Sequence, residues 1–195
     1  MTSALRRLHP TLDVIVVAPG ESGARLALQS GASRTIPGGK AGLETLADAD
    51  GGRLLRPTMT RLPILADGVD AVIDCVGAPD TIRLGMHVLR PGGMLVLVGS
   101  AAKQRVDWSL VWNRQLTVQG TIHSGPEPSL GGRATMAEVV DWLADDAFPV
   151  DHLLTHAFAL DEWRAALSTA SAGPRAAAVK VALRPNPTLP LVPTP

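Results

Sequence analysis

The sequence predicts an α/β fold, built on a parallel sheet with helices on both faces. Strand-like and helix-like segments alternate along the chain, and the strand-like segments are apolar throughout. A continuous apolar run is typical of a strand that is buried on both faces, as in a parallel sheet covered by helices. The 195 residues are 46% hydrophobic and 18% charged, with a formal net charge of zero. This composition is that of an ordinary globular protein with one sizeable domain.

The first third of the chain carries two of the strands. Leu12–Val17 is a β-branched apolar run between Pro10 and the turn Ala18-Pro19-Gly20, so it predicts a buried strand. Apolar residues at helical spacing and helix-ending Gly or Pro residues mark the other elements. In chain order we expect a helix at Ser3–His9, this strand, a helix at Glu21–Ser30, a short strand at Arg34–Ile36, a helix at Ala41–Asp50 and an irregular stretch at Gly51–Asp67.

The remainder of the chain repeats the alternation. Val69–Val76 and Met94–Val98 are continuous apolar strands, and both end at a glycine. Between them, the helix Asp80–Leu89 is stopped by the turn Pro91-Gly92-Gly93. The pattern continues with a strand at Leu116–Ile122, helices at Arg133–Asp145 and Asp161–Ala172, and a last strand at Ala177–Leu183. We therefore expect one α/β domain over 1–184, and a disordered tail over 185–195, where five of eleven residues are proline.

Composition also excludes several classes of function. The balanced charge gives no basic surface for nucleic acid or anionic membranes, and no apolar run reaches the ~18 residues that span a bilayer. The charged helix at the N-terminus argues against a secretory signal, so the cytoplasm is the expected compartment. Cys75 is the only cysteine, which excludes an internal disulfide, and its place in an apolar strand predicts a small core residue.

The loops that follow the strands are the candidate binding site. Ligands of open parallel sheets bind outside the carboxyl ends of the strands. Val76-Gly77 and Val98-Gly99-Ser100 stand at two such ends, where apolar side chains and bare backbone suit a dinucleotide. Glycine also ends strands in α/β folds generally, so both interpretations stay open. Among the histidines, only His123 follows a strand end closely enough to meet a ligand.

Two further classes of function stay open. A Pro-Gly-Gly turn before a strand also occurs in methyltransferases, although the acidic ribose ligand that they need is replaced by Ala18. The chain could alternatively be a non-catalytic interaction module that assembles through its edge strands. The four tryptophans are predicted to serve packing or subunit contacts, which leaves a homo-oligomer open.

Several stretches together resemble the cofactor-binding Rossmann domain of zinc-type medium-chain alcohol dehydrogenases. The resemblance is carried by the strand and turn at 67–77, the helix Asp80–Leu89, the turn at 90–93, the strand through Val98-Gly99-Ser100, and the segments at 113–121, 155–162 and 178–181. It covers about residues 4 to 184 and rests on the order and spacing of these segments. The resemblance implies hydride transfer between an alcohol and a nicotinamide, with zinc polarising the oxygen.

The resemblance also implies where the cofactor lies. It assigns NAD(P) contacts to Val76, Gly77, Val98, Gly99, Ser100, Thr121, Ile122 and His123. NAD-preferring members carry an acid where Ala18 stands, whereas Arg25 is placed to meet a 2′-phosphate, so NADP is expected rather than NAD.

The family's glycine-rich phosphate loop and its zinc-binding domain both precede the helix that matches Ala4–His9. We therefore expect the fold to lack the family's first strand, which would pair between Leu12–Val17 and Val69–Val76. Zinc is expected only in that missing domain. The isolated chain is predicted to bind dinucleotide weakly and to be inactive by itself.

Overall fold

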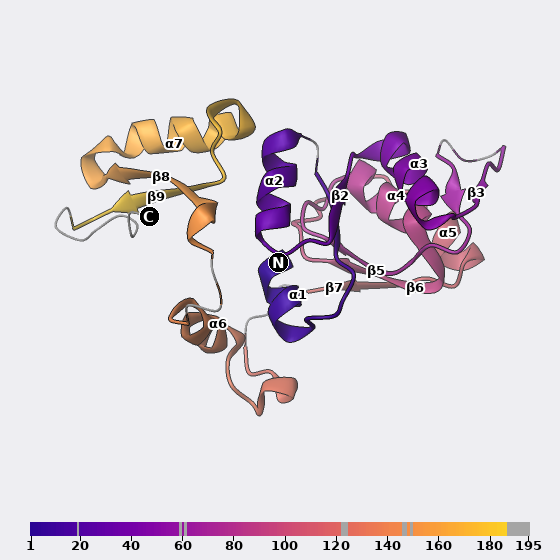
Figure 1. The fold of residues 1–195 in the computed structure, drawn as a ribbon, viewed down its shortest axis with the longest axis horizontal. Helices are drawn as coiled ribbons and strands as arrows, with labels where there is room; N and C mark the ends of the chain where they lie inside the picture. Colours follow the sequence, from indigo (N-terminus) through magenta and orange to yellow (C-terminus); the bar gives the residue numbers. More distant parts are fainter. Residues whose placement is uncertain are drawn as a thin grey trace. The chain divides into compact units, whose positions relative to one another are not determined.

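A computed structural model of the protein describes residues 1–18, 20–58, 60, 62–121, 125–145, 148 and 150–186. The chain divides into two compact units. Figure 1 labels their helices and strands. Unit 1 contains Met1–Thr35 and Pro126–Pro195, and unit 2 contains Ile36–Gly125.

Unit 1 begins with the predicted alternation of helices and short strands. Its first elements are α1 (Thr2–Leu8), β1 (Ile15–Val17), α2 (Glu21–Gln29) and β2 (Arg34–Ile36, whose last residue belongs to unit 2), and β1 pairs with β2. Strand β1 is shorter than the predicted Leu12–Val17. The guanidinium of Arg6 donates hydrogen bonds to the carbonyls of Pro10 and Leu12, so a side chain holds the stretch before the strand.

The C-terminal part of unit 1 contains a parallel strand–helix–strand motif. Strands β8 (Leu154–Ala159) and β9 (Lys180–Arg184) pair in parallel, and α7 (Trp163–Ala172) packs against both. Strand β8 was not predicted as a strand. The preceding elements are the 3₁₀ turn η1 (Pro128–Leu130), α6 (Thr135–Leu143) and η2 (Asp151–Leu153); η3 (Leu160–Glu162) and η4 (Gly173–Ala176) flank α7. From residue 187 onward, the predicted tail lies outside the described residues.

Unit 2 combines a parallel sheet with helices. The strands β5 (Val69–Asp74), β6 (Leu89–Leu97) and β7 (Thr117–Gly120) form one parallel sheet in that order. Helix α4 (Pro79–Val88) packs on β5 and β6, and α3 (Gly39–Asp50) and α5 (Ser109–Asn113) pack on α4. The stretch that was predicted to be irregular contains a small antiparallel pair, β3 (Leu54–Leu55) and β4 (Ile64–Leu65).

The predicted turn at Pro91-Gly92-Gly93 lies within strand β6. Val69 pairs with Leu89, but Ala71 pairs with Met94, so the residues between them bulge out of the ladder. Gly92 accommodates this irregularity with a φ of +73°, a region that favours glycine. Gly92 and Gly93 therefore form a bulge within strand β6, and not a turn between the helix and the strand.

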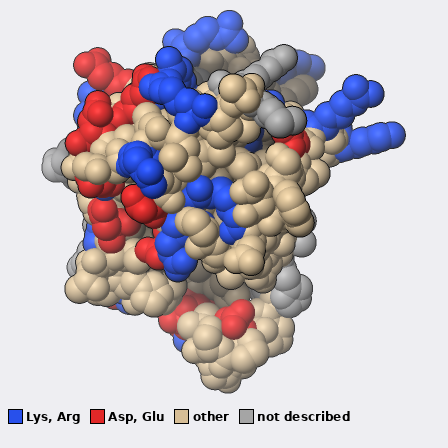
Figure 2. Space-filling model, turned by 90° about the vertical axis from the view of Figure 1, so that its right-hand side faces the viewer, with Lys and Arg blue, Asp and Glu red and all other residues tan. Residues whose placement is uncertain are grey.

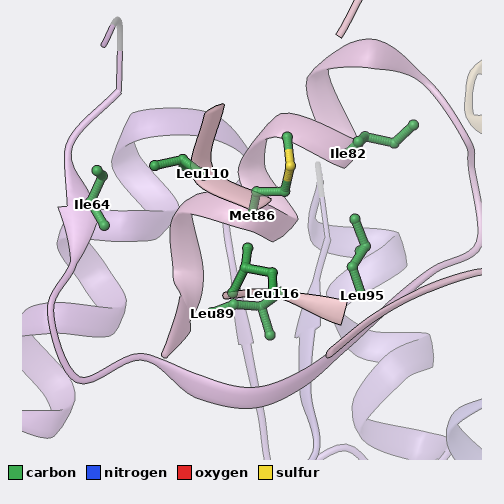
Figure 3. Packing of buried hydrophobic residues seen from close by; sticks show 7 residues of the cluster. All are labelled: Ile64, Ile82, Met86, Leu89, Leu95, Leu110 and Leu116. Carbon is green, nitrogen blue, oxygen red and sulfur yellow. The ribbon is translucent and has the colours of Figure 1, made fainter. Parts of the chain in front are cut away.

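A cluster of aliphatic side chains forms the core of unit 2. It brings α4 and the covered face of the sheet together with β4 and α5, as Figure 3 shows. Leu89 and Leu95 are fully buried and Met86 is 1% exposed. The cluster consists of Ile64, Ile82, Met86, Leu89, Leu95, Leu110 and Leu116.

The α/β class is confirmed, with parallel strands and helices in the predicted order. Strand β1 belongs to one sheet with β2, and β5 belongs to another with β6. The prediction that the strands are buried on both faces is wrong at several positions, because Val17, Met94 and Val98 are 47%, 38% and 38% exposed. On β6, Leu95 and Leu97 meet the core cluster, whereas Met94 between the bulge and Leu95 is exposed.

Candidate functional site

The carboxyl ends of β5, β6 and β7 meet at one edge of the sheet in unit 2. The register pairs Asp74 with Leu97 and Leu97 with Gly120, so the loops that follow start side by side. The N–H groups of Val98 and Gly99 donate to the carbonyl of Asp74 at 2.9 and 2.8 Å, and Thr121 N–H donates to Leu97 at 3.0 Å. This edge brings together six of the ten predicted site residues: Val76, Gly77, Val98, Gly99, Ser100 and Thr121.

The other four predicted residues are not among the described residues of unit 2. Ile122 and His123 lie outside the described residues. Ala18 follows β1 and Arg25 lies on α2, and both belong to unit 1. Arg25 is exposed, and within the described part of the chain no side-chain hydrogen bond or ion pair of its guanidinium is found. Ala18 lies beside the first turn of α2, because a Cβ added to Gly23 would be 3.8 Å from the Cβ of Ala18.

A buried carboxylate organises the first loop of the edge. Asp74 is 4% exposed, and its Oδ1 accepts the N–H groups of Val76 at 2.8 Å and Gly77 at 3.1 Å. Its Oδ2 lies 2.9 Å from the hydroxyl of Thr81, which also accepts the N–H of Ala78 at 3.2 Å. Sequence reasoning missed Asp74. The available signal was an aspartate inside an apolar strand, three residues before a glycine, because Asp often accepts the backbone N–H groups that follow it in a turn.

The two glycines of the edge bring the loops into backbone contact. A Cβ on Gly77, whose φ is +79°, would lie 2.8 Å from the N of Ala101. A Cβ on Gly99 would lie 2.3 Å from the carbonyl carbon of Val76. The Gly77 carbonyl also accepts a hydrogen bond from Gln104 Nε2 at 3.0 Å. Glycine is therefore required here for contact between the loops, and approach of a ligand is not needed to explain it.

The side chains that the edge exposes are mainly apolar. Val76 is 62% exposed and Val98 is 38% exposed. The N–H groups of Val76, Gly77, Val98, Gly99 and Thr121 all donate within the chain. These groups do not form an anion-binding nest, and the edge instead offers aliphatic side chains of the kind that contact a flat ring.

Cys75 is exposed at this edge, so its prediction as a core residue is wrong. Alternate side chains of a strand point to opposite faces, and Asp74 takes the buried direction. Cys75 follows it and points away from the core.

Two ionisable side chains with shifted pKa values, His87 and Arg114, lie in the interior of unit 2. Burial lowers the pKa of His87, whose Nδ1 lies 2.9 Å from the carbonyl of Pro63. Burial also lowers the pKa of Arg114, whose Nη2 donates to the carbonyls of Leu65, Ala66 and Leu89 at 2.9, 3.1 and 2.7 Å. Both side chains bond to backbone carbonyls, so their role is structural.

The described residues do not form a metal centre. Among them, no group of three or more His, Cys, Asp or Glu side chains is arranged to hold a metal ion. Acidic and basic side chains both occur on the face shown in Figure 2. No helix in the described part of the chain is long and apolar enough to cross a membrane.

Comparison with known proteins first defines the class of fold. An alcohol dehydrogenase from Escherichia coli CFT073, solved with NADH, matches 92% of this chain and 47% of its own with a TM-score of 0.66 and 19% identity. A zinc-binding dehydrogenase from Sinorhizobium meliloti 1021, bound to NADP, matches 93% of this chain and 47% of its own with a TM-score of 0.63 and 23% identity. The fold is that of the Rossmann-type dehydrogenases.

The sequence then assigns the family. Residues 7–145 match the model of the zinc-binding dehydrogenase family, and the chain belongs to that family. A probable D-xylulose reductase from Aspergillus clavatus is 31% identical over 111 residues, which are 56% of this chain and 29% of the reductase. The chain thus spans less than half the length of these three proteins.

Proposed function

We propose that this chain is the cofactor-binding part of an NAD(P)-dependent alcohol or polyol dehydrogenase. The observation that carries the proposal is the pair of exposed valines, Val76 and Val98, on adjacent loops at the carboxyl edge of a parallel sheet. Membership of the zinc-binding dehydrogenase family supports it, as do the nicotinamide cofactors bound by two proteins of similar fold. When bound, the nicotinamide accepts or donates the hydride.

The residues of the edge would bind and orient one face of the nicotinamide ring. Val76 and Val98 offer branched side chains that exclude water from that face, and the backbone contact between the loops fixes their spacing. Thr121, the residue after β7, is exposed at the same edge of the sheet. We place Ile122 and His123, which follow it in sequence, in the same group.

The described residues do not fit the zinc that the family name implies. The chain has a single cysteine, and its described part holds no cluster of metal-ligating side chains. We therefore assign no step of the reaction to a metal held by these residues, and infer that a catalytic zinc is bound elsewhere in the whole enzyme.

A titration followed by NMR tests the proposal. The amide resonances of ¹⁵N-labelled protein are recorded while NADPH, NADH or S-adenosylmethionine is added. We expect NADPH and NADH to shift the amides of loops 75–78, 98–101 and 121–125, with a Kd of about 1 mM or weaker. The sequence contains no Gly-x-Gly-x-x-Gly loop to hold the phosphates, so binding is weak. Shifts caused only by S-adenosylmethionine would favour a methyltransferase-like domain, and micromolar binding would contradict the weak-binding prediction.

Substitution of Val76 tests which surface binds. Val76→Asp places a charge on an exposed side chain without disturbing the core, and we expect it to abolish the nicotinamide shifts. Val140→Asp is the matched control, because Val140 on α6 is 56% exposed. Equal effects of the two variants, or no effect of either, would contradict the assignment of the edge.

For the cofactor itself, we propose NADP rather than NAD. Ala18 provides no carboxylate for the ribose hydroxyls, and Arg25 is an exposed cation on the helix that follows. Arg25→Glu is expected to lower the affinity for NADPH, relative to that for NADH, by about five- to tenfold. The 2′-phosphate would lose a charged donor and face a carboxylate. Arg175→Glu, at another exposed arginine of unit 1, is the control. An unchanged ratio of the two affinities would refute the role of Arg25.

A further inference from the structure

Asp74 is the only residue of the edge that bonds to both loops, through different groups, among the residues that the structure describes. Its carboxylate accepts two N–H groups of the first loop, from Val76 and Gly77. Its backbone carbonyl accepts two N–H groups of the second, from Val98 and Gly99. Replacing the side chain would release the first loop and leave the bonds of the second in place.

The carboxylate is held from its far side by Thr81. The Thr81 hydroxyl carries one proton and lies 2.9 Å from Asp74 Oδ2 and 3.0 Å from the carbonyl of Ala78. It accepts the N–H of Ala78 as well, which joins the turn to the start of α4. An ionised acceptor makes stronger hydrogen bonds to backbone N–H groups than a neutral one. The carboxylate thus fixes both the direction of the loop and the beginning of the next helix.

The position of the first loop sets that of the second. Positions 77 and 99 leave no room for a Cβ, because the neighbouring backbone atoms would lie within 3 Å of it. A displacement of Val76 or Gly77 therefore forces a displacement of Gly99, or opens a gap between the loops. The exposed side chains of Val76 and Val98 move with these backbones.

We propose that Asp74 is a positioning residue for the nicotinamide-facing edge. Asp74 is 4% exposed and its carboxylate points into the turn, so it acts on a ligand through Val76 and Val98 without touching it. The ligand role rests on the proposed function, whereas the control of loop geometry does not. This separation allows the two to be tested independently.

The variants Asp74→Asn and Asp74→Ala separate positioning from charge. Asparagine retains Oδ1 for the two N–H groups, and its amide nitrogen donates to Thr81 Oγ1, whose own proton then goes to the Ala78 carbonyl. We expect Asp74→Asn to keep the loop amide resonances and to bind NADPH within about twofold of the wild type. Asp74→Ala leaves two N–H groups without an acceptor, and we expect the resonances of both loops to shift and NADPH to bind about tenfold more weakly.

Two matched variants exclude a loss of stability as the cause. Thr81→Val removes the hydroxyl from the far side of the carboxylate, and we expect shifts of the same amides by a smaller amount. Leu84→Ala, in the same helix at a residue that is 7% exposed, lowers stability without a bond to either loop. We expect it to leave NADPH affinity unchanged at a temperature where it is folded.

Loop resonances and affinity that remain unchanged in Asp74→Ala, or an equal loss of affinity in Leu84→Ala, would overturn the proposal. If the wild type binds no dinucleotide at all, the proposed function fails and the ligand role with it. The loop resonances of the same variants would then still show whether Asp74 holds both loops. Should Asp74→Ala fail to fold, Asp74→Asn and Thr81→Val supply the same comparison.

Discussion

Different interactions stabilise the interior of each unit. Unit 2 is stabilised mainly by buried apolar side chains. The largest fully buried side chains of the described structure all lie there: Leu43, Leu46, Ile82, Met86, Leu89 and Leu95. In unit 1, hydrogen bonds and ion pairs of arginine side chains connect the segments. Arg6 donates to the carbonyls of Gly31, Pro10 and Leu12 and to the hydroxyl of Ser33.

A second arginine of unit 1 connects α1 to the segment around α6. Arg7 lies 2.8 Å from the carboxylate of Asp145 and stacks over the rings of Trp142 and Phe148 at 5.4 and 6.0 Å. Hydrogen bonds and exposed ion pairs each contribute little net free energy, whereas a fully buried leucine contributes several times more. We therefore expect unit 2 to be the more stable unit, and unit 1 to be the more sensitive to single polar contacts.

Leu89→Ala should have the largest effect on stability. Leu89 is fully buried in the cluster of unit 2, so its truncation loses transfer free energy and leaves a cavity. We expect the free energy of unfolding to fall by about 3 kcal/mol. Urea unfolding followed by hydrogen exchange and mass spectrometry measures the change in each unit. Leu167→Ala on α7 is the control at a 57% exposed leucine, and a loss below about 1 kcal/mol in Leu89→Ala would contradict the apolar account of unit 2.

Arg6 gives the corresponding test in unit 1. Arg6→Ala removes the hydrogen bonds that tie α1 to the stretches at 10–12 and 31–33. We expect a loss of about 1 to 2 kcal/mol, seen as faster hydrogen exchange in those two stretches, with exchange in unit 2 unchanged. Arg6→Lys keeps the charge and loses the fork of donors, so it should recover only part of the protection. Full recovery in Arg6→Lys would show that charge, and not the geometry of the guanidinium, holds these stretches.

The same contrast explains which parts of the fold could be predicted from the sequence. Helix α4 and the strands β5 and β6 were recognisable because apolar side chains form them, and apolar periodicity is the strongest local signal. Strand β8 was missed because Thr155 and His156 interrupt its apolar pattern. Helix α5 was missed because five residues are too few for helical periodicity to show.

At the site, sequence reasoning found the loops but not what fixes them. A continuous apolar strand carries no sign of which parity faces the core, so Cys75 was assigned to the interior that Asp74 occupies. Gly77 and Gly99 were predicted as ligand contacts because they follow strand ends, but their contact with the neighbouring loop depends on two strands that are separate in sequence. Long-range packing of this kind leaves no local pattern to detect.

His87 provides the smallest effect, and it appears only at acidic pH. Burial lowers the pKa of His87 below its ordinary value of 6.5, and the charge of Arg83 lowers it further. The hydrogen bond to the Pro63 carbonyl and the charge of Asp107 act in the opposite direction but do not reverse the shift. The unfolded chain therefore takes up a proton first as the pH falls, which favours unfolding.

The sign and the size of this pH dependence follow directly. Above pH 6.5 the imidazole is neutral in both states and adds no pH dependence. Below it, the free energy of unfolding of unit 2 falls until the pH reaches the lowered pKa of the folded state, by at most about 1.4 kcal/mol one pH unit below the ordinary value. His87→Asn keeps a donor for the Pro63 carbonyl and cannot titrate, so the difference in unfolding midpoint between wild type and variant should narrow or invert as the pH falls from 7.5 to about 5.5. A difference that stays constant over that range would mean that His87 is not the group that makes unit 2 sensitive to acid.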